Sequence, residues 1–330
     1  MKLHQEGAPC LLPPWERREP LQCTPIRFPS VRSVCAQTMT AAPIETPVVS
    51  APARAAASAC AGVAAEIALV HGWAMSPRVY AALEASLHGQ VVRTLALPGH
   101  EGAPPIRAAR LEDWADALAA GLADASVLVG WSLGAMLALD IACRHPHKVS
   151  RLVLLAGTAR FVADDTGWPG LQAEVVDAFQ RDYASAPAAT LARFLALQCI
   201  GEPRRRVVQQ ALAQCLSPGA QEGLCAGQAA DDGLRPGVGR SAAPNPFEDG
   251  LAILAAADLR PLLGGIRQPV LLLHGDQDAL MPVAAAYRLA QALPQARLQV
   301  LEGSGHALPV SRAADCAGHI LAFVGARGDA

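Results

Sequence analysis

From residue 66 onward, short apolar runs alternate with helical patterns, and this alternation restricts the fold more than any other feature of the chain. Runs such as IALVHG and QPVLLLHG are apolar and end in glycine, which is typical of buried strands. Buried strands that alternate with helices form a parallel sheet with helices on both faces. We therefore predict an α/β fold of this kind. The predicted strands lie within 67–72, 91–102, 126–130, 149–157, 268–275 and 296–303, and the predicted helices within 111–124, 133–146, 284–293 and 315–325.

A long segment, 160–260, interrupts the alternation between the fourth and fifth predicted strands. It contains helical patterns but no convincing strand, and its part 217–250 is rich in Gly, Pro and Ala. We expect a helical lid insertion at 160–260 that contains a long loop at 217–250. The insertion divides the α/β core into 63–159 and 261–330.

Residues 1–62 differ in character from the rest of the chain. They carry many prolines and scattered arginines without a sustained period of 2 or 3.6 residues. The sequence LLPP at 11–14 leaves no apolar stretch suited to a secretory signal, and nearby glutamates argue against an organellar transit peptide. We expect a disordered extension. The alternative is that translation starts at Met39 or at a later codon.

Charge and cysteine usage exclude several classes of function. The formal net charge of −2 gives no field that would attract nucleic acid or an anionic membrane. No uncharged apolar run reaches the roughly 18 residues of a membrane-spanning helix. The nine cysteines form no CxxC pair and no metal-like spacing, which favours reduced thiols in the cytoplasm. We expect a cytoplasmic monomer without nucleic-acid or membrane partners.

The first candidate for chemistry is the turn between a predicted strand and a predicted helix. The sequence GWSLG at 130–134 fits the pattern G-x-S-x-G, in the strand–turn–helix context that a nucleophile elbow requires. Such a turn strains the backbone of Ser132, so its neighbours must be small, and the following helix N-terminus stabilises negative charge nearby. We predict that Ser132 is a nucleophile. The alternative is a serine that only caps the helix.

A serine nucleophile needs a general base and an acid that orients the base. Asp276 and Asp278 follow one late predicted strand, and His306 follows the next, which gives the chain order Ser, acid, His of α/β-hydrolases. The carboxyl ends of these strands meet at one edge of the sheet. Asp278 lies further from its strand end and can reach His306, whereas Asp276 is expected to cap the loop. The predicted triad is Ser132, Asp278 and His306.

An oxyanion hole needs two backbone N–H groups. Leu133 follows the nucleophile and supplies one, and Trp73, in the loop after the first strand, is the candidate for the other. We expect His71 to shape this loop rather than to catalyse. His100 either lines the mouth of the site or lies in a surface loop.

Aromatic and basic residues of the insertion leave two interpretations open. Phe179, Phe194 and Trp168 either belong to the core or line a substrate pocket. The run RRR at 204–206 is either a solvated helix face or a docking patch for an acidic protein.

With these residues placed, the chain from about residue 66 resembles the α/β-hydrolases. More narrowly, it is similar to the family of pimeloyl-acyl-carrier-protein methyl ester esterases of biotin synthesis. The matching stretches are LVHGWAM (69–75), LVGWSLGAM (128–136), WPG (168–170), RFLALQ (193–198), LAILAAADLR (251–260) and GSGHALP (303–309). RFLALQ lies in the insertion, where hydrolases with different substrates differ most, so it is more specific than the triad.

The resemblance implies the α/β-hydrolase fold, with a helical lid, and roles for four further residues. Phe194 and Gln198 would touch the substrate, while Arg193 and Arg206 would grip the acyl-carrier protein. Two other positions where the family can carry arginine lack it here, and the loop at 217–250 is longer than usual.

The implied reaction is hydrolysis of the methyl ester of pimeloyl-acyl-carrier protein to methanol and the free acid, by a serine carboxylesterase. The positioned hydroxyl does the chemistry, so no metal or cofactor is expected. A general short-chain carboxylesterase or lipase is the alternative, and acyl transfer to another acceptor is a second. A non-catalytic binding protein of this fold is disfavoured by the intact Ser132, Asp278 and His306.

Overall fold

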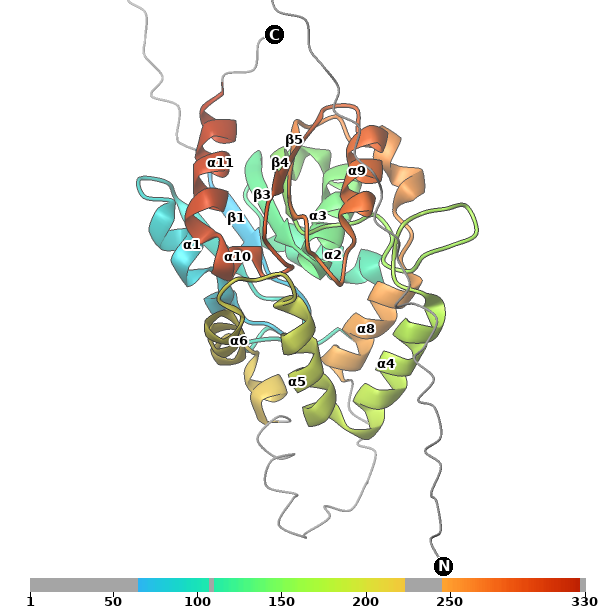
Figure 1. Cartoon of the computed structure of the whole chain (residues 1–330). Helices are drawn as coiled ribbons and strands as arrows, with labels where there is room; N and C mark the ends of the chain where they lie inside the picture. The colour runs from blue at the N-terminus through green and yellow to red at the C-terminus, as the bar shows by residue number, and fades with distance from the viewer. Residues whose placement is uncertain (1–64, 107–109, 223–244, 327–330) are drawn as a thin grey trace, which may run out of the picture. The chain divides into compact units, whose positions relative to one another are not determined.

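The computed structural model describes residues 65–106, 110–222 and 245–326, and within them six strands form one sheet in which every adjacent pair is parallel. The strand order is β2-β1-β3-β4-β5-β6, so β1 and β3 are neighbours although β2 lies between them in the sequence (Figure 1). The predicted α/β fold with a parallel sheet is confirmed. The predicted extension at 1–62 lies outside the described residues. The strands are β1 (Ile67–Val70), β2 (Val92–Leu95), β3 (Ser126–Trp131), β4 (Val149–Leu155), β5 (Val270–Gly275) and β6 (Ala296–Leu301).

Helices cover both faces of the sheet, because both faces of its central strands are apolar. Figure 1 shows α1 and α11 on one face and α2, α3 and α9 on the other. The four helices predicted for the core are present, whereas α1, α10 and the short 3₁₀ helices are too short to show a periodic pattern. The bounds are η2 (Pro77–Tyr80), α1 (Ala81–Ser86), α2 (Leu111–Gly121), α3 (Leu133–Arg144), η3 (Pro146–Lys148), η5 (Arg260–Gly265), α9 (Val283–Ala292), α10 (Leu308–Ser311) and α11 (Ala313–Gly325).

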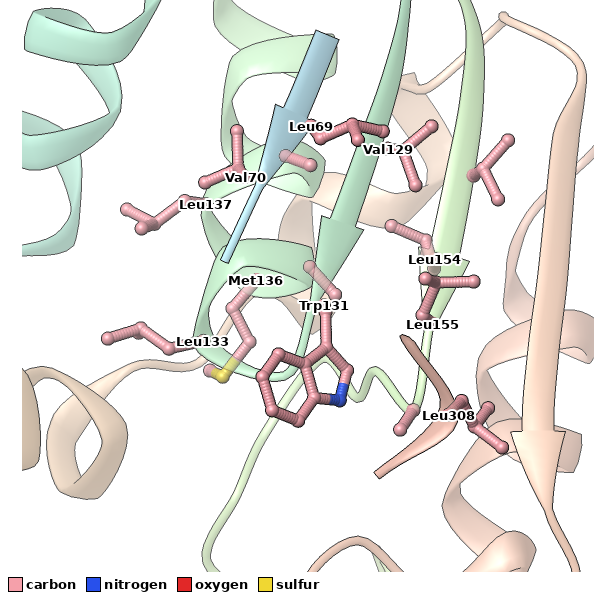
Figure 2. Close-up of a cluster of buried hydrophobic side chains, with 14 of the residues drawn as sticks. Leu69, Val70, Val129, Trp131, Leu133, Met136, Leu137, Leu154, Leu155 and Leu308 are labelled. Atoms are coloured by element: carbon pink, nitrogen blue, oxygen red, sulfur yellow. The ribbon is translucent and has the colours of Figure 1, made fainter. Parts of the chain in front are cut away.

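The hydrophobic core lies along the central strands. Every residue of β1, β3 and β5 is buried, whereas residues of the edge strand β6 alternate between exposed and half-buried before its last position. Figure 2 shows part of the core, where side chains of β1, β3 and β4 meet Met136 and Leu137 of α3 and Leu308 of α10. No helix among the described residues is long and apolar enough to cross a membrane.

The helices α4, α5, α6 and α8 occupy much of the described part of 160–260, and they lie together at one end of the sheet (Figure 1). This end is the one where the strands finish, because the segments that follow β1 and β6 contact these helices. Trp73 donates its indole N–H to the Phe247 carbonyl, 2.7 Å away, and the His306 amide donates to the Gln198 carbonyl at 3.2 Å. We call this segment the insertion. Its helices are α4 (Ala173–Ser185), α5 (Pro187–Gln198), α6 (Arg205–Gln214) and α8 (Pro246–Ala256).

The predicted bounds of the loop at 217–250 are wrong at both ends. Residues 218–222 are helical, and α8 begins at Pro246, while 223–244 lie outside the described residues. The start of α8 has a clear local cause. The Asn245 side chain accepts hydrogen bonds from the amides of Phe247 and Glu248, at 3.1 and 3.4 Å, and proline occupies the first helical position.

Ion pairs join the two ends of the insertion. Arg160 contacts Asp258 at 2.9 Å, and Arg260 contacts both Asp258, at 2.6 Å, and Asp164, at 2.7 Å. The hydrogen bond from Arg260 lowers the pKa of the Asp258 carboxyl to about 2. Trp168 belongs to this network, because its indole N–H donates to the Arg160 carbonyl and Arg260 lies over its ring. It is not among the residues that line the apolar pocket between α4, α5 and α8.

Helix α3 packs closely against β1 at Gly134. A Cβ atom placed on this glycine would lie 2.2 Å from the Val70 carbonyl oxygen and 2.6 Å from that of His71. Both obstacles are backbone atoms of a buried strand end, so neither can move aside cheaply. A side chain at position 134 would therefore separate α3 from the sheet.

We expect Gly134→Ala to lower the free energy of unfolding by about 3 kcal/mol or more, through overpacking of main chain against main chain. Gly318→Ala is the matched control, since Gly318 is exposed in α11 and a Cβ there meets no atom within 4 Å. The control should stabilise the protein by about 1 kcal/mol, because alanine is the better helix former. Urea unfolding measures both values. Equal small effects at the two positions would contradict the packing account.

Candidate active site

Ser132 occupies a strained turn between β3 and α3. Its φ of 57° and ψ of −119° lie in a region that residues with side chains rarely adopt. Both flanking glycines are required, because a Cβ on Gly130 would lie 2.3 Å from the Gly134 carbonyl oxygen. Ser132 stands at the N-cap position of α3, yet its side chain makes no capping hydrogen bond. The helix-cap interpretation therefore does not explain this hydroxyl.

The Ser132 hydroxyl instead begins a hydrogen-bonded series through the two other predicted residues. Its Oγ lies 2.9 Å from Nε2 of His306, and Nδ1 of His306 lies 2.7 Å from Oδ2 of Asp278. All three side chains are buried. The arrangement lets Oγ–H donate to Nε2 while Nδ1–H donates to the carboxylate. The structure thus brings together the three residues that the sequence placed on separate strand ends.

The two aspartates after β5 have different surroundings. Oδ1 of Asp278 accepts the amides of Leu280 and Met281 at 2.9 and 2.8 Å, which leaves Oδ2 for His306. Asp276 points elsewhere and accepts the Ser304 amide at 3.2 Å, the loop-capping role expected of it.

The carboxyl of Asp278 is held in its ionised form. Burial alone would raise its pKa, but the attraction of His306 and the hydrogen bond from the His306 ring, with help from His274, lower the pKa below the ordinary aspartate value. An ionised Asp278 fixes the Nδ1–H tautomer of His306. Nε2 is then free to accept the proton of a serine hydroxyl.

His274, inside β5, is a site residue that sequence reasoning missed. Its Nε2 donates to the Met281 carbonyl at 2.7 Å and lies 3.6 Å from Oδ2 of Asp278. Burial lowers the pKa of this imidazole, so the ring is neutral. The signal available in the sequence is a single polar residue within the otherwise apolar run VLLLHG. His274 closes the turn that carries Asp278.

The residues predicted to supply the oxyanion donors belong to two segments that meet at Ser132. Leu133 is the first residue of α3, and the first N–H groups of a helix have no partner within it. The segment after β1 passes close by, because a Cβ on Gly72 would lie only 3.1 Å from the Ser132 Cβ. Trp73 follows directly, so its N–H belongs to the same peptide unit as the Gly72 carbonyl.

His71 fixes the direction of that peptide unit. Its Nδ1 donates to the Gly72 carbonyl at 2.9 Å, and its Nε2 accepts the Leu97 amide at 3.1 Å. Burial, with a smaller contribution from His100, lowers the pKa of His71 to about 3, so the ring stays neutral and can accept. The Gly72 carbonyl and the Trp73 N–H point in opposite directions from one planar unit. The hydrogen bond from His71 to the Gly72 carbonyl therefore also orients the Trp73 N–H.

His100 does not lie in a surface loop. Its ring is fully buried, 5.5 Å from the ring of His71 and 4.8 Å from that of Phe247 in α8. Burial lowers its pKa to about 4. His100 is therefore a neutral packing residue beneath the insertion.

The Trp73 side chain anchors a cluster of aromatic rings from the insertion. Phe194 of α5 lies 4.9 Å from its ring, and Tyr183 and Phe179 of α4 lie 5.4 and 5.9 Å away. Edge-on contacts of this kind fix the relative positions of the rings. The cluster therefore sets the distance between the insertion and the segment after β1.

An apolar pocket lies between α4, α5 and α8. Its lining includes Leu280, two residues after Asp278. Phe179 and Phe194 line this pocket, so of the two interpretations left open by the sequence, pocket lining applies to both residues. The complete lining is Phe161, Leu171, Val175, Val176, Phe179, Phe194, Leu197, Leu251, Leu254 and Leu280.

Gln198, at the end of α5, has an unpaired side chain. It is fully buried, and neither atom of its amide has a hydrogen-bond partner among the described residues. Burying an amide without partners costs about 1–3 kcal/mol, so a bound group that supplied them would gain this amount. Its main chain accepts the His306 amide.

The two arginines expected to bind a carrier protein have different surroundings. Arg193 is already paired with Asp182 at 2.7 Å, and its guanidinium lies over the Phe179 ring. Arg206 is exposed on α6 and takes part in no ion pair among the residues that the structure describes. Arg206 is therefore the freer of the two cations.

Comparison with known proteins places this geometry in a family. The family model described as the alpha/beta hydrolase fold matches residues 67–313. A pimeloyl-acyl-carrier-protein methyl ester esterase of Aromatoleum aromaticum is 45% identical over 258 residues, which cover 76% of this chain and 95% of the relative. A protein of the same name from Chromobacterium violaceum is 34% identical over 74% of this chain and 89% of its own length.

Solved structures agree on the fold. An esterase from Exiguobacterium antarcticum has a TM-score of 0.65 at 18% identity, over 79% of this chain and 92% of that one. A bromoperoxidase from Bacillus anthracis has a TM-score of 0.64 at 19% identity, over 80% and 92% of the two chains. The chain belongs to the α/β-hydrolase fold family and, within it, to the family of pimeloyl-acyl-carrier-protein methyl ester esterases.

Proposed function

We propose that this chain is the serine carboxylesterase that hydrolyses the methyl ester of pimeloyl-acyl-carrier protein in biotin synthesis, releasing methanol and pimeloyl-acyl-carrier protein. The observation that carries the proposal is the buried series Ser132–His306–Asp278 in a member of this esterase family. The relatives' names supply the substrate, and the site supplies the means of hydrolysing an ester.

The proposed mechanism uses the chain's own groups throughout. Ser132 Oγ attacks the ester carbonyl while Nε2 of His306 takes the hydroxyl proton, and Asp278 stabilises the imidazolium that forms. The oxyanion lies between the amides of Trp73 and Leu133. The tetrahedral intermediate collapses to an acyl-enzyme, and His306 protonates the departing methoxide. Water then repeats the sequence, and Ser132 recovers its proton.

The insertion acts as the lid of the site in this proposal. Its apolar pocket offers a lining suited to the methylene chain of a pimeloyl group, since transfer of a methylene from water stabilises binding by about 0.8 kcal/mol. Gln198 has an unpaired amide that can bind a polar group of the substrate. Phe194 lines the pocket and contacts Trp73, so it links the acyl chain to the oxyanion loop.

The proposed setting is a cytoplasmic monomer that meets its substrate on the carrier protein. The cysteines of the described residues are all free thiols, which is usual in a reducing compartment.

The function is tested by growth without biotin. A bacterial strain that lacks its own pimeloyl-ester esterase should grow on biotin-free medium when it expresses this chain, and Ser132→Ala should not restore growth. Equal amounts of both proteins in the soluble fraction make the comparison valid. Failure of the wild-type chain to restore growth, together with fast hydrolysis of a short-chain ester, would favour a general carboxylesterase.

The assignment of the acid is tested by two matched substitutions. Asp278→Asn should lower kcat on a chromogenic short-chain ester by about 10⁴-fold, because the amide no longer holds His306 in the Nδ1–H tautomer. Asp276→Asn makes the same chemical change two residues away and should stay within about threefold of wild type, because asparagine keeps a side-chain oxygen that can accept the Ser304 amide. Similar losses in both variants would contradict the assignment.

Carrier-protein docking is tested on α6. Arg206→Glu should lower kcat/KM for the carrier-bound ester by about tenfold, because it places a negative charge opposite an acidic partner. Hydrolysis of a small ester should not change. Arg288→Glu, an equal charge change on the exposed face of α9, is the control and should affect neither substrate. Equal losses on both substrates with Arg206→Glu would indicate damage to the fold instead of to docking.

A further inference from the structure

Glu202 is a buried carboxylate that the mechanism leaves without a role. It lies between α5 and α6, in the insertion, and only 8% of its surface is exposed. Its Oε1 accepts two hydrogen bonds, from the Gly305 amide and from the Ser311 hydroxyl, each 2.8 Å long. Gly305 directly precedes His306, and Ser311 ends α10. One oxygen of the insertion therefore holds both sides of the segment that carries the catalytic base.

The main chain next to Glu202 reinforces this contact. The His306 amide donates to the Gln198 carbonyl at 3.2 Å, so two consecutive amides of the histidine segment have acceptors in the insertion. The approach is very close, because a Cβ on Gly305 would lie 2.3 Å from the Ile200 carbonyl oxygen. No core element contributes these two acceptors.

The carbonyl of His306 is held from the other side. The indole N–H of Trp131, the residue before the nucleophile, donates to it at 2.9 Å. Hydrogen bonds therefore fix the backbone around His306 to Trp131 in β3 and to the segment 198–202 of the insertion. The imidazole must lie within hydrogen-bonding distance of Ser132 to take its proton. If the contacts with the insertion were lost, the backbone of His306 could shift and carry the imidazole away from Ser132.

We propose that Glu202 is a positioning residue for His306, so that the insertion sets the geometry of proton transfer as well as the shape of the substrate pocket. The inference rests on the proposed esterase mechanism. Glu202 touches neither substrate nor reacting atoms and acts through the Gly305 amide. Its effect should therefore appear in kcat on any ester, including one too small to contact the insertion.

The test compares Glu202→Leu, which removes the oxygen that accepts from Gly305 and Ser311, with Glu202→Gln, which keeps an acceptor oxygen in a side chain of the same shape. With a chromogenic acetate ester, Glu202→Leu should lower kcat by about 10- to 100-fold while KM stays within about threefold, since misplacing a catalytic group by about 1 Å costs up to about 10² in rate. Glu202→Gln should restore most of the loss. Glu174→Leu, the same change on the exposed face of α4, should leave kcat unchanged.

Labelling of Ser132 by a fluorophosphonate separates positioning from folding. In Glu202→Leu, the labelling rate should fall in parallel with kcat, while the final stoichiometry stays equal to that of the wild type. The proposal would be overturned if Glu202→Leu kept the labelling rate and the kcat of the wild type. It would also be overturned if the variant changed only KM or only the final stoichiometry of labelling. Equal losses in Glu202→Gln and Glu202→Leu would also overturn it. Failure of the wild type itself to be labelled would instead refute the esterase mechanism.

Discussion

The packing of α3 against β1 is the contact on which the site depends. It holds because Gly134 has no side chain to meet the Val70 carbonyl, and it puts the first residue of α3 directly after a serine with a φ of 57°. At the same turn, Gly72 lies against the Ser132 Cβ. Ser132, Leu133 and Gly72 are thus positioned by one local packing arrangement instead of by separately placed loops.

The electrostatics around this turn are simple because the neighbouring histidines are neutral. Burial lowers the pKa of His71 to about 3 and that of His100 to about 4, and it lowers the pKa of His274 as well. Asp278 is ionised, and its ion-pair partners among the described residues are two histidines, His306 and His274, with no lysine or arginine. Its full negative charge is therefore available to stabilise that imidazolium.

The sequence was sufficient wherever a signal is local. Apolar runs located the six strands of the described residues, and the order of Ser132, Asp278 and His306 after β3, β5 and β6 located the hydrogen-bonded series. Partnerships between distant residues were not accessible in this way. Glu202 meets its partners 103 and 109 positions later, and nothing in the run GEPRRR marks it as buried. The pairing of Arg193 with Asp182 is hidden for a different reason, because exposed charges give no sign in the sequence of whether they form an ion pair.

The contacts of the insertion have a consequence for protein engineering. Met75, after β1, forms a bridge with Leu216, after α6, and the Ser76 amide donates to the Cys215 carbonyl at 2.8 Å. Together with Glu202 and the Gln198 carbonyl, these contacts mean that the insertion supplies hydrogen-bond acceptors to the segment after β1 and to the segment after β6. A lid transplanted from another hydrolase to change substrate preference would leave these amides without acceptors unless the stretches around 198–202 and 215–217 were kept. Pocket-lining residues outside the Trp73 ring cluster, such as Val175, Leu251 and Leu254, are therefore the ones to exchange.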